Sequence, residues 1–230
     1  MHTVLAIFVK HPRPGQVKTR LAADLGAQPA ADLYAAFQAD LAGRFRKLGD
    51  RQLLCFSPNH PVSAAYFSDL ADGNYDLWPQ PSGDLGVRLA AFFDEQFANG
   101  AERVVVIGSD SPTLPVDFIE RAFERLTTHD VVLGPATDGG YYLLGQSRAA
   151  HPLFRGIDWS SSRVLEQTVA YIQADRLRLS LLSPWYDVDT IDDLDLLRGH
   201  MAALRCAGLS ESCRRTESLL KPGRISPIRS

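Results

Sequence analysis

Short runs of apolar residues alternate along the chain with longer segments in which apolar residues recur at the period of a helix. The runs predict strands near residues 3–9, 51–56, 75–78, 103–108, 130–135, 140–145 and 177–183. The longer segments predict helices near residues 29–48, 61–71, 85–99, 115–127, 162–174 and 190–204. This alternation predicts an α/β fold, in which a mostly parallel sheet is flanked by helices on both faces.

One pair of predicted strands breaks the alternation. The strands at 130–135 and 140–145 are separated only by a short turn that contains glycine. A parallel connection needs a crossover of a dozen or more residues, so this turn is too short for one. We therefore expect one antiparallel or offset strand and a mixed sheet.

Composition narrows the class of protein. The chain has 230 residues, 45% of them apolar, which suits one domain over residues 1–204 followed by a tail at 205–230. The tail carries six basic and two acidic residues. A net charge of −3 does not favour nucleic acid as a partner. The three cysteines are odd in number and lack metal-ligand spacing, which argues against a disulfide framework and a zinc site.

The apolar run at 3–9 is too short to span a membrane, and no basic region precedes it. It is interpreted as the first core strand. We therefore expect a cytoplasmic protein without a membrane partner.

An acidic residue follows the strand predicted at 103–108. In open α/β sheets ligands bind beyond the carboxyl ends of the strands, where Asp110 is expected to lie. Its carboxylate is placed to hold Mg²⁺ or Mn²⁺ against the phosphates of a nucleotide, because these hard cations prefer oxygen ligands. The alternative is that Asp110 caps the next helix, with Pro112 and Pro115 shaping its start.

The loop after the first predicted strand is rich in positive charge. It contains Lys10, Arg13, Lys18 and Arg20, together with Gly15 and two prolines. Backbone N–H groups and bidentate arginine contacts in such a loop can neutralise a diphosphate. The loop lacks the leading glycine and the spacing of a P-loop. The alternative is a solvated basic loop without a ligand.

Two helix starts carry further candidates. Asp84 is either a simple cap of the helix at 85–99 or part of a site in which Gly83 lies close to a bound base or ribose. Ser160 and Ser161 precede Arg163 at the helix near 162–174, but the residues that follow do not complete a capping box. We interpret this serine run as facing a ligand.

Three more aspartates lie near predicted strand ends. Asp138 begins an Asp-Gly-Gly sequence that is typical of a tight turn. Asp187 and Asp189 precede the last predicted helix, whose cap is assigned to Thr190. The two side chains are expected to point in opposite directions, so that only one of Asp187 and Asp189 faces a cation.

These segments together resemble a known family, the bacterial glycosyltransferase-like proteins associated with arsenosugar biosynthesis. That family is similar in turn to the phospholactate and molybdenum-cofactor guanylyltransferases. The resemblance covers roughly residues 1–200 and rests on segments that occur in order at 14–21, 83–89, 108–112, 138–145, 159–168 and 187–190. It implies the GT-A type nucleotide-diphospho-sugar transferase fold.

The resemblance also implies roles for individual residues. Lys18 and Arg20 would contact phosphates, Asp110 would be the main metal ligand, and Asp189 would take the second metal position. Asp138 would lie on the acceptor side of the site. Five further residues are assigned to the acceptor side: Tyr141, Trp159, Ser160, Ser161 and Arg163.

The predicted function is metal-dependent transfer of a sugar from a nucleotide-diphosphate donor to a small-molecule acceptor. Transfer with inversion needs a general base near the acceptor hydroxyl, and Asp138 is the candidate. An alternative is a nucleotidyltransferase of the guanylyltransferase kind, in which a nucleoside triphosphate loses pyrophosphate, because the four loop cations suit a triphosphate. A second alternative is a non-catalytic nucleotide-binding module, against which carboxylates at three separate strand ends count.

Overall fold

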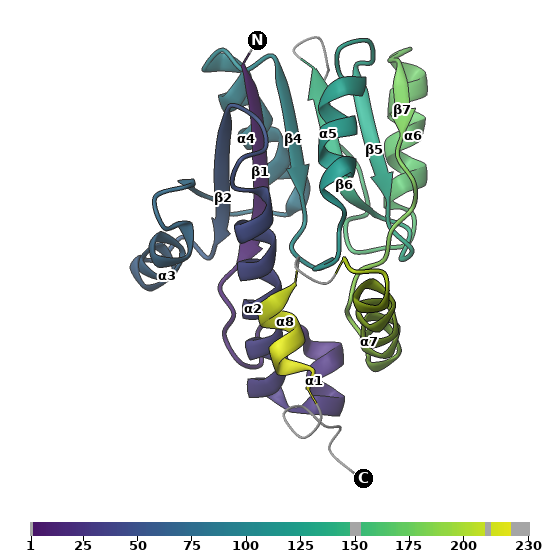
Figure 1. Ribbon diagram of the computed structural model, residues 1–230. Coiled ribbons are helices and arrows are strands. Elements are labelled where there is room, and N and C mark those ends of the chain that lie inside the picture. Colours follow the sequence, from purple (N-terminus) through teal and green to yellow (C-terminus); the bar gives the residue numbers. More distant parts are fainter. Residues whose placement is uncertain (1, 148–152, 210–212, 222–230) are drawn as a thin grey trace.

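The computed structural model describes residues 2–147, 153–209 and 213–221. Residues 210–212 and 222–230 of the predicted tail lie outside the described residues. Within the described part, one seven-stranded sheet stands between layers of helices (Figure 1). The α/β fold predicted from the alternation of apolar runs and helical segments is confirmed.

The sheet is mixed, as the short turn after residue 135 predicted. Its spatial order is β3-β2-β1-β4-β6-β5-β7. β6 runs antiparallel to β4 and β5, and the other neighbouring pairs are parallel. The strands are β1 (Thr3–Lys10), β2 (Arg51–Ser57), β3 (Asp76–Pro79), β4 (Arg103–Ile107), β5 (Val131–Pro135), β6 (Tyr141–Ser147) and β7 (Leu179–Leu181).

The helices match the predicted segments except near the N-terminus, and one further short helix lies beyond the last segment, in the predicted tail. They are α1 (Thr19–Leu25), α2 (Ala27–Phe45), α3 (Pro61–Ala71), α4 (Leu85–Ala98), α5 (Val116–Arg125), α6 (Val164–Ala174), α7 (Ile191–Cys206) and α8 (Arg214–Leu219). The single helix expected at 29–48 is wrong at its start, because helix α1 already begins at Thr19. Gly26, at φ 87°, then separates α1 from α2 with a backbone conformation that favours glycine.

Each face of the sheet has its own apolar core because successive strand side chains point to opposite faces. On one face α2, α3 and α5 cover Leu5, Ile7 and Val105. On the other face α4 and α6 cover Val4 and Val106, with the aromatic rings of α4 packed against the strands. This division places both central strands, β1 and β4, under cover on both sides.

A third core lies beyond the carboxyl ends of the parallel strands, where Figure 1 shows α1, α7 and α8 gathered below the sheet. It contains Leu21 of α1, Phe37 of α2, Leu197 of α7 and Val188 from the segment before α7. This cluster fixes the basic loop and the segment before α7 against each other. Both segments carry predicted site residues.

The C-terminal helix α8 is attached to α2 by one carboxylate. Asp40 accepts hydrogen bonds from the backbone N–H groups of Arg215 at 3.0 Å and Thr216 at 2.8 Å. Just before α8, the buried Cys213 thiol donates to the carbonyl of Pro112 at 2.9 Å. The predicted domain boundary at residue 204 lies inside α7, and α8 packs beyond it on α2.

Candidate active site

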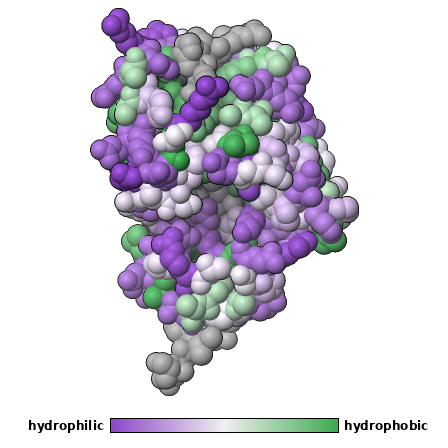
Figure 2. Space-filling view, turned by 180° about the vertical axis from the view of Figure 1, so that it is seen from behind, coloured by the Kyte–Doolittle hydropathy of each residue, from purple (hydrophilic) through white to green (hydrophobic). Residues whose placement is uncertain are grey.

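A cavity of about 740 Å³ opens at the carboxyl ends of β1 and β4. This is the edge at which open α/β sheets bind ligands. Its walls come from the ends of β1 and β4, the start of α4, the turn before β6, the loop before α6 and the segment before α7. In the view from the α4 side, Figure 2 shows a hollow near the middle of the surface with mainly hydrophilic residues around it.

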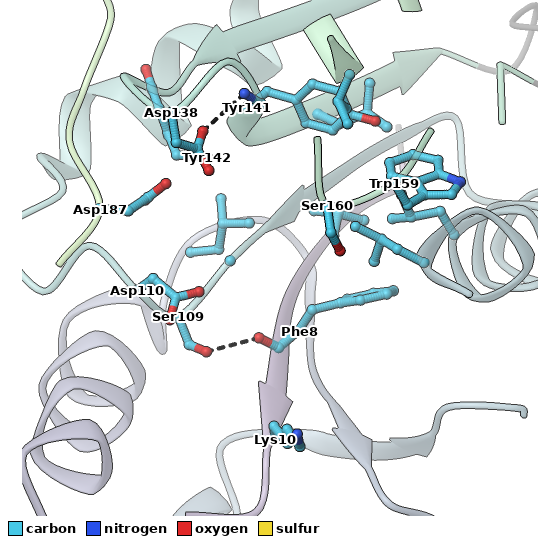
Figure 3. Close-up of a pocket in the computed structure, with 18 of the residues that line it drawn as sticks. Phe8, Lys10, Ser109, Asp110, Asp138, Tyr141, Tyr142, Trp159, Ser160 and Asp187 are labelled. Atoms are coloured by element: carbon cyan, nitrogen blue, oxygen red, sulfur yellow. Dashed lines mark hydrogen bonds between the residues drawn. The ribbon is translucent and has the colours of Figure 1, made fainter. Parts of the chain in front are cut away.

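Four carboxylates line the cavity: Asp110, Asp138, Asp187 and Asp189. Asp110 follows β4, Asp138 lies in the turn between β5 and β6, and the other two precede α7. Figure 3 shows Asp187 between Asp138 and Asp110. The expectation that Asp187 and Asp189 point in opposite directions is wrong, because residues two apart in an extended segment share a side and both residues line the cavity.

Lys18 forms ion pairs with two of these carboxylates, Asp110 and Asp189. Its ammonium contacts Asp110 Oδ1 and lies 2.9 Å from Asp189 Oδ1, and its side chain is 3% exposed. Burial alone would lower the pKa of Lys18, but the two ion pairs outweigh burial and raise it. Arg20 binds the other oxygen of Asp189 at 2.8 Å. Both oxygens of Asp189 therefore have cationic partners.

Asp187 has a different environment. It accepts a hydrogen bond from the hydroxyl of Ser111, and it is half-buried at the wall of the cavity. Burial raises the pKa of Asp187 to about 7, and the nearby charges of Asp110 and Asp138 act in the same direction. A group that titrates close to neutral pH in a cavity is a marker of a functional site.

A chain of hydrogen bonds holds the segment that carries Asp110. Ser109 Oγ lies 2.7 Å from the hydroxyl of Tyr34 and donates to the carbonyl of Phe8 at 3.0 Å (Figure 3). Burial, with the negative charge of Asp110, raises the pKa of Tyr34 to about 12. The phenol therefore stays protonated, and the end of β4 is tied to β1 and α2.

The turn that carries Asp138 is packed against the serine run. Asp138 Oδ1 accepts the backbone N–H of Gly140 at 2.8 Å. Gly139 has φ +92°, and a Cβ built on it would lie 2.2 Å from the carbonyl oxygen of Ser162. Only glycine fits this position, because it tolerates the positive φ and leaves room for the neighbouring backbone. The turn and the serine run consequently keep a fixed separation.

One part of the cavity is apolar and aromatic. Phe8, Leu85, Tyr141 and Trp159 line it, and Figure 3 shows Trp159 and Tyr141 well away from Asp110 and Asp187. Trp159 sits against the first turn of α4, where a Cβ on Gly86 would lie 2.5 Å from Trp159 Nε1. The cavity thus combines a charged part with a part suited to a ring or an apolar group.

The structure brings most of the predicted residues together, but not all. Of the predicted set, nine residues line the cavity: Lys10, Arg20, Asp110, Asp138, Asp189, Tyr141, Trp159, Ser160 and Ser161. Five predicted residues other than Lys18 do not line it, namely Arg13, Gly15, Gly83, Asp84 and Arg163. Asp84 caps α4 by accepting the N–H of Val87 at 2.9 Å, and Arg163 pairs with Asp158.

The structure adds residues that the sequence did not single out. Gln80 and Arg88 line the cavity and bind each other, with Arg88 Nη1 3.1 Å from Gln80 Oε1. Gln80 also donates to the carbonyl of Cys55 at 2.6 Å, which ties the end of β2 to α4. Arg88 stands in the segment 83–89 that carries part of the family resemblance, so its position there was the available signal.

The carboxylates suit a hard divalent cation. Asp110 is 42% exposed at its side chain and has one oxygen, Oδ2, outside the contact with Lys18. Within the described residues no group of three or more histidines, cysteines or acidic residues is arranged to hold a metal. Mg²⁺ usually binds through one or two carboxylates with waters and substrate phosphates, so Asp110 with Asp187 or Asp189 fits this pattern.

The fold is that of the nucleotide-diphospho-sugar transferases. A structure from Desulfovibrio desulfuricans G20, provisionally described as a nucleotide-diphospho-sugar transferase, matches with a TM-score of 0.85 and 32% identity, over 95% of this chain and 97% of that one. Rv0371c from Mycobacterium tuberculosis H37Rv, solved as a complex with manganese, matches with a TM-score of 0.52 and 15% identity, over 86% of this chain and 98% of that one. CMP:2-keto-3-deoxy-manno-octonic acid synthetase complexed with CTP matches with a TM-score of 0.54 and 9% identity, over 88% of this chain and 99% of that one.

The chain belongs to the family DUF2064, described as an uncharacterized protein conserved in bacteria, whose match spans residues 41–161. A comparison with curated proteins gave no match. Among the described residues, no helix has both the length and the apolar character needed to cross a membrane.

Proposed function

We propose that the protein is a metal-dependent glycosyltransferase that moves a sugar from a nucleotide-diphosphate donor to a small-molecule acceptor. The observation that carries the proposal is one cavity in which four carboxylates adjoin an aromatic region. A divalent cation would bridge the carboxylates to a diphosphate in the charged part, and a sugar or acceptor ring suits the aromatic part. The resemblance to glycosyltransferase-like proteins associated with arsenosugar biosynthesis supports the same reaction class.

In the proposed reaction the acceptor hydroxyl oxygen attacks the anomeric carbon of the donor sugar. The bond between that carbon and the diphosphate oxygen breaks, and the leaving nucleoside diphosphate keeps the electron pair. Asp138 accepts the proton of the acceptor hydroxyl, which is the role of a general base. Asp138 has one oxygen outside its hydrogen bond to Gly140, and it lines the cavity.

Lys10 and Arg20 face the cavity and would bind the diphosphate. Mg²⁺ or Mn²⁺ bound by Asp110 with Asp189 would neutralise charge on the leaving diphosphate. Asp187 lines the same cavity and would contribute to binding the cation or its waters.

Nucleotidyl transfer is the second candidate. The number of cations in the basic loop favours it, since a triphosphate carries more charge than a diphosphate. Of the four loop cations, however, only Lys10 and Arg20 line the cavity. Arg88 of α4 is a third cationic side chain that lines the cavity, and this set suits a diphosphate and a triphosphate alike, so the preference for glycosyl transfer rests on the family resemblance.

The test is calorimetric binding of UDP, GDP, CTP, GTP and the corresponding nucleotide sugars, each with and without Mn²⁺. We expect metal-dependent binding of one diphosphate and its sugar. A preference for a triphosphate, with pyrophosphate released in the presence of an acceptor, would instead establish nucleotidyl transfer. Absence of binding by every nucleotide would refute both reactions.

Two variants separate the proposed roles. Asp110→Asn should abolish the Mn²⁺-dependent part of nucleotide binding, because it removes a charged ligand at the cation site. Asp138→Asn should keep nucleotide binding and lose turnover by at least about 100-fold, the lower range for general base catalysis. Asp32→Asn is the matched control, because Asp32 is exposed on α2 and does not line the cavity. Full metal-dependent binding by Asp110→Asn would overturn the cation assignment.

A further inference from the structure

Lys18 was expected to bind phosphate, yet its side chain is buried beneath the carboxylates and does not line the cavity. We propose that Lys18 is an internal counter-ion that holds the place of the divalent cation between Asp110 and Asp189 and leaves it when the cation arrives with a nucleotide. This inference rests on the metal dependence in the proposed function. It gives Lys18 a regulatory role, in which uptake of the cation is coupled to uptake of the phosphates.

The position of the ammonium supports this role. The ammonium of Lys18 contacts Oδ1 of both carboxylates, at 2.9 Å in the case of Asp189. A metal ion that coordinates the same two oxygens has to lie between them, where the ammonium lies. A cation cannot share that space with a buried ammonium, because like charges in a site of low dielectric repel strongly.

The partners of Asp189 point the same way. Its Oδ1 is paired with Lys18 and its Oδ2 with Arg20 at 2.8 Å. Asp189 therefore has no oxygen without a cationic partner, and it becomes a metal ligand only after one partner moves. Arg20 is 66% exposed and contacts only Asp189 of the two carboxylates. Lys18 is buried and contacts both.

Phosphate is needed for the exchange because a buried ammonium without an anion is unfavourable. The rings of Tyr34 and Phe37, at 5.5 Å and 6.0 Å from the ammonium, stabilise it only in part. Phosphate bound near Lys10 and Arg20 supplies the anion that replaces the carboxylates. The free protein then binds the metal ion weakly, and the nucleotide strengthens that binding.

The backbone conformation of Lys18 is a further observation that supports the proposal. It has φ 47° and ψ 45°, a left-handed conformation that residues with a Cβ seldom adopt. Such strain persists where the surroundings hold a residue in place, and it concentrates at functional sites. Lys18 is the N-cap of helix α1, and its carbonyl accepts the N–H of Ala22 at 2.7 Å, so the strained residue is fixed at its main chain.

The experiment measures Mn²⁺ binding to the full chain by electron paramagnetic resonance of the free ion, so no activity is required. Lys18→Met should bind Mn²⁺ at least about tenfold more tightly than the wild type in the absence of nucleotide, since it removes a buried like charge. Arg20→Met is the matched control, since it also removes one positive charge next to Asp189, and its exposed, solvent-screened charge should change the affinity less than about threefold. With UDP present, the difference between wild type and Lys18→Met should shrink to a similarly small factor.

Three results would overturn the inference. They are unchanged or weaker Mn²⁺ binding by a folded Lys18→Met protein, an equal gain in Arg20→Met, and a difference between wild type and Lys18→Met that UDP leaves as large as before. Thermal unfolding followed by circular dichroism checks the fold, and Lys18→Gln replaces Lys18→Met if the latter does not fold. Failure of the proposed function is distinct: then none of the proteins binds Mn²⁺, with or without UDP, and the inference falls with it.

Discussion

Asp40 of α2 accepts two hydrogen bonds from the backbone of α8, so replacing it by alanine should loosen the docking of that helix. Asp40 is 7% exposed and accepts two backbone N–H groups, of Arg215 and Thr216. Hydrogen bonds to a charged group contribute about 1.5–3 kcal/mol each. Because both bonds share one carboxylate, whose burial is itself costly, we expect a loss of about 3 kcal/mol, the lower end of their sum.

A loss of this size raises the population of undocked α8 roughly 100-fold, because about 1.4 kcal/mol corresponds to a factor of ten. The assay is limited trypsin digestion followed by mass spectrometry, with cleavage after Arg214 and Arg215 inside α8 as the readout. When closing is faster than cleavage, the cleavage rate follows the open population. We therefore expect a roughly 100-fold faster cut in Asp40→Ala.

Asp32→Ala is the control, because Asp32 is an exposed residue of the same helix, α2. Its cleavage rate should match that of the wild type. If Asp40→Ala were cut no faster than Asp32→Ala, the two hydrogen bonds would not hold α8, and the reasoning would be refuted.

Two other predictions concern the turn at the site and the edge of the sheet. Gly139→Ala should lower the free energy of unfolding by about 3 kcal/mol, because the new Cβ clashes with the backbone of Ser162 and the φ of +92° is strained for alanine. Gly140→Ala is the control, and it should lower the free energy of unfolding by less than about 1 kcal/mol, because its Cβ meets only a side-chain oxygen at 3.2 Å. Urea unfolding of the two variants compares these values. Hydrogen bonds from Arg178 lower the pKa of Asp130, so its contribution to stability is present above the unfolded pKa of about 3.9 and is lost as pH falls through the lower folded pKa. Asp130→Asn should thus destabilise by about 1–2 kcal/mol at neutral pH and by much less in strong acid, and an equal effect at both pH values would contradict the assignment.

The sheet and most helices were predictable because their apolar positions repeat at a fixed period. The predicted helix at 61–71 has the same bounds as α3. The short turn before β6 correctly predicted an antiparallel strand. Helix α1 was not predicted because the charges of Lys18 and Arg20 mask its helical pattern. In that pattern Leu21 and Leu25 recur four residues apart, and both are buried.

The site was harder to predict than the fold, because its geometry depends on residues far apart in the chain. The expectation for Asp187 and Asp189 was wrong because residues two apart in an extended segment point to the same side and not to opposite sides. No local pattern reports that Lys18 meets a carboxylate 171 positions away. Positive charge alone indicates phosphate binding equally for Arg13 and Lys10, although only Lys10 lines the cavity.

The chain order of the site has a consequence for synthesis. Asp110 belongs to the middle of the chain, but Asp187 and Asp189 come late, and α8 meets Pro112 and Asp40 later still. Growing chains fold from the N-terminus as they emerge from the ribosome. The central strands β1 and β4 can therefore pair while the later acidic segment has not yet been made. A nascent chain lacks half of the carboxylates of its cavity until the segment before α7 has emerged, so the acidic part of the cavity is completed late in synthesis.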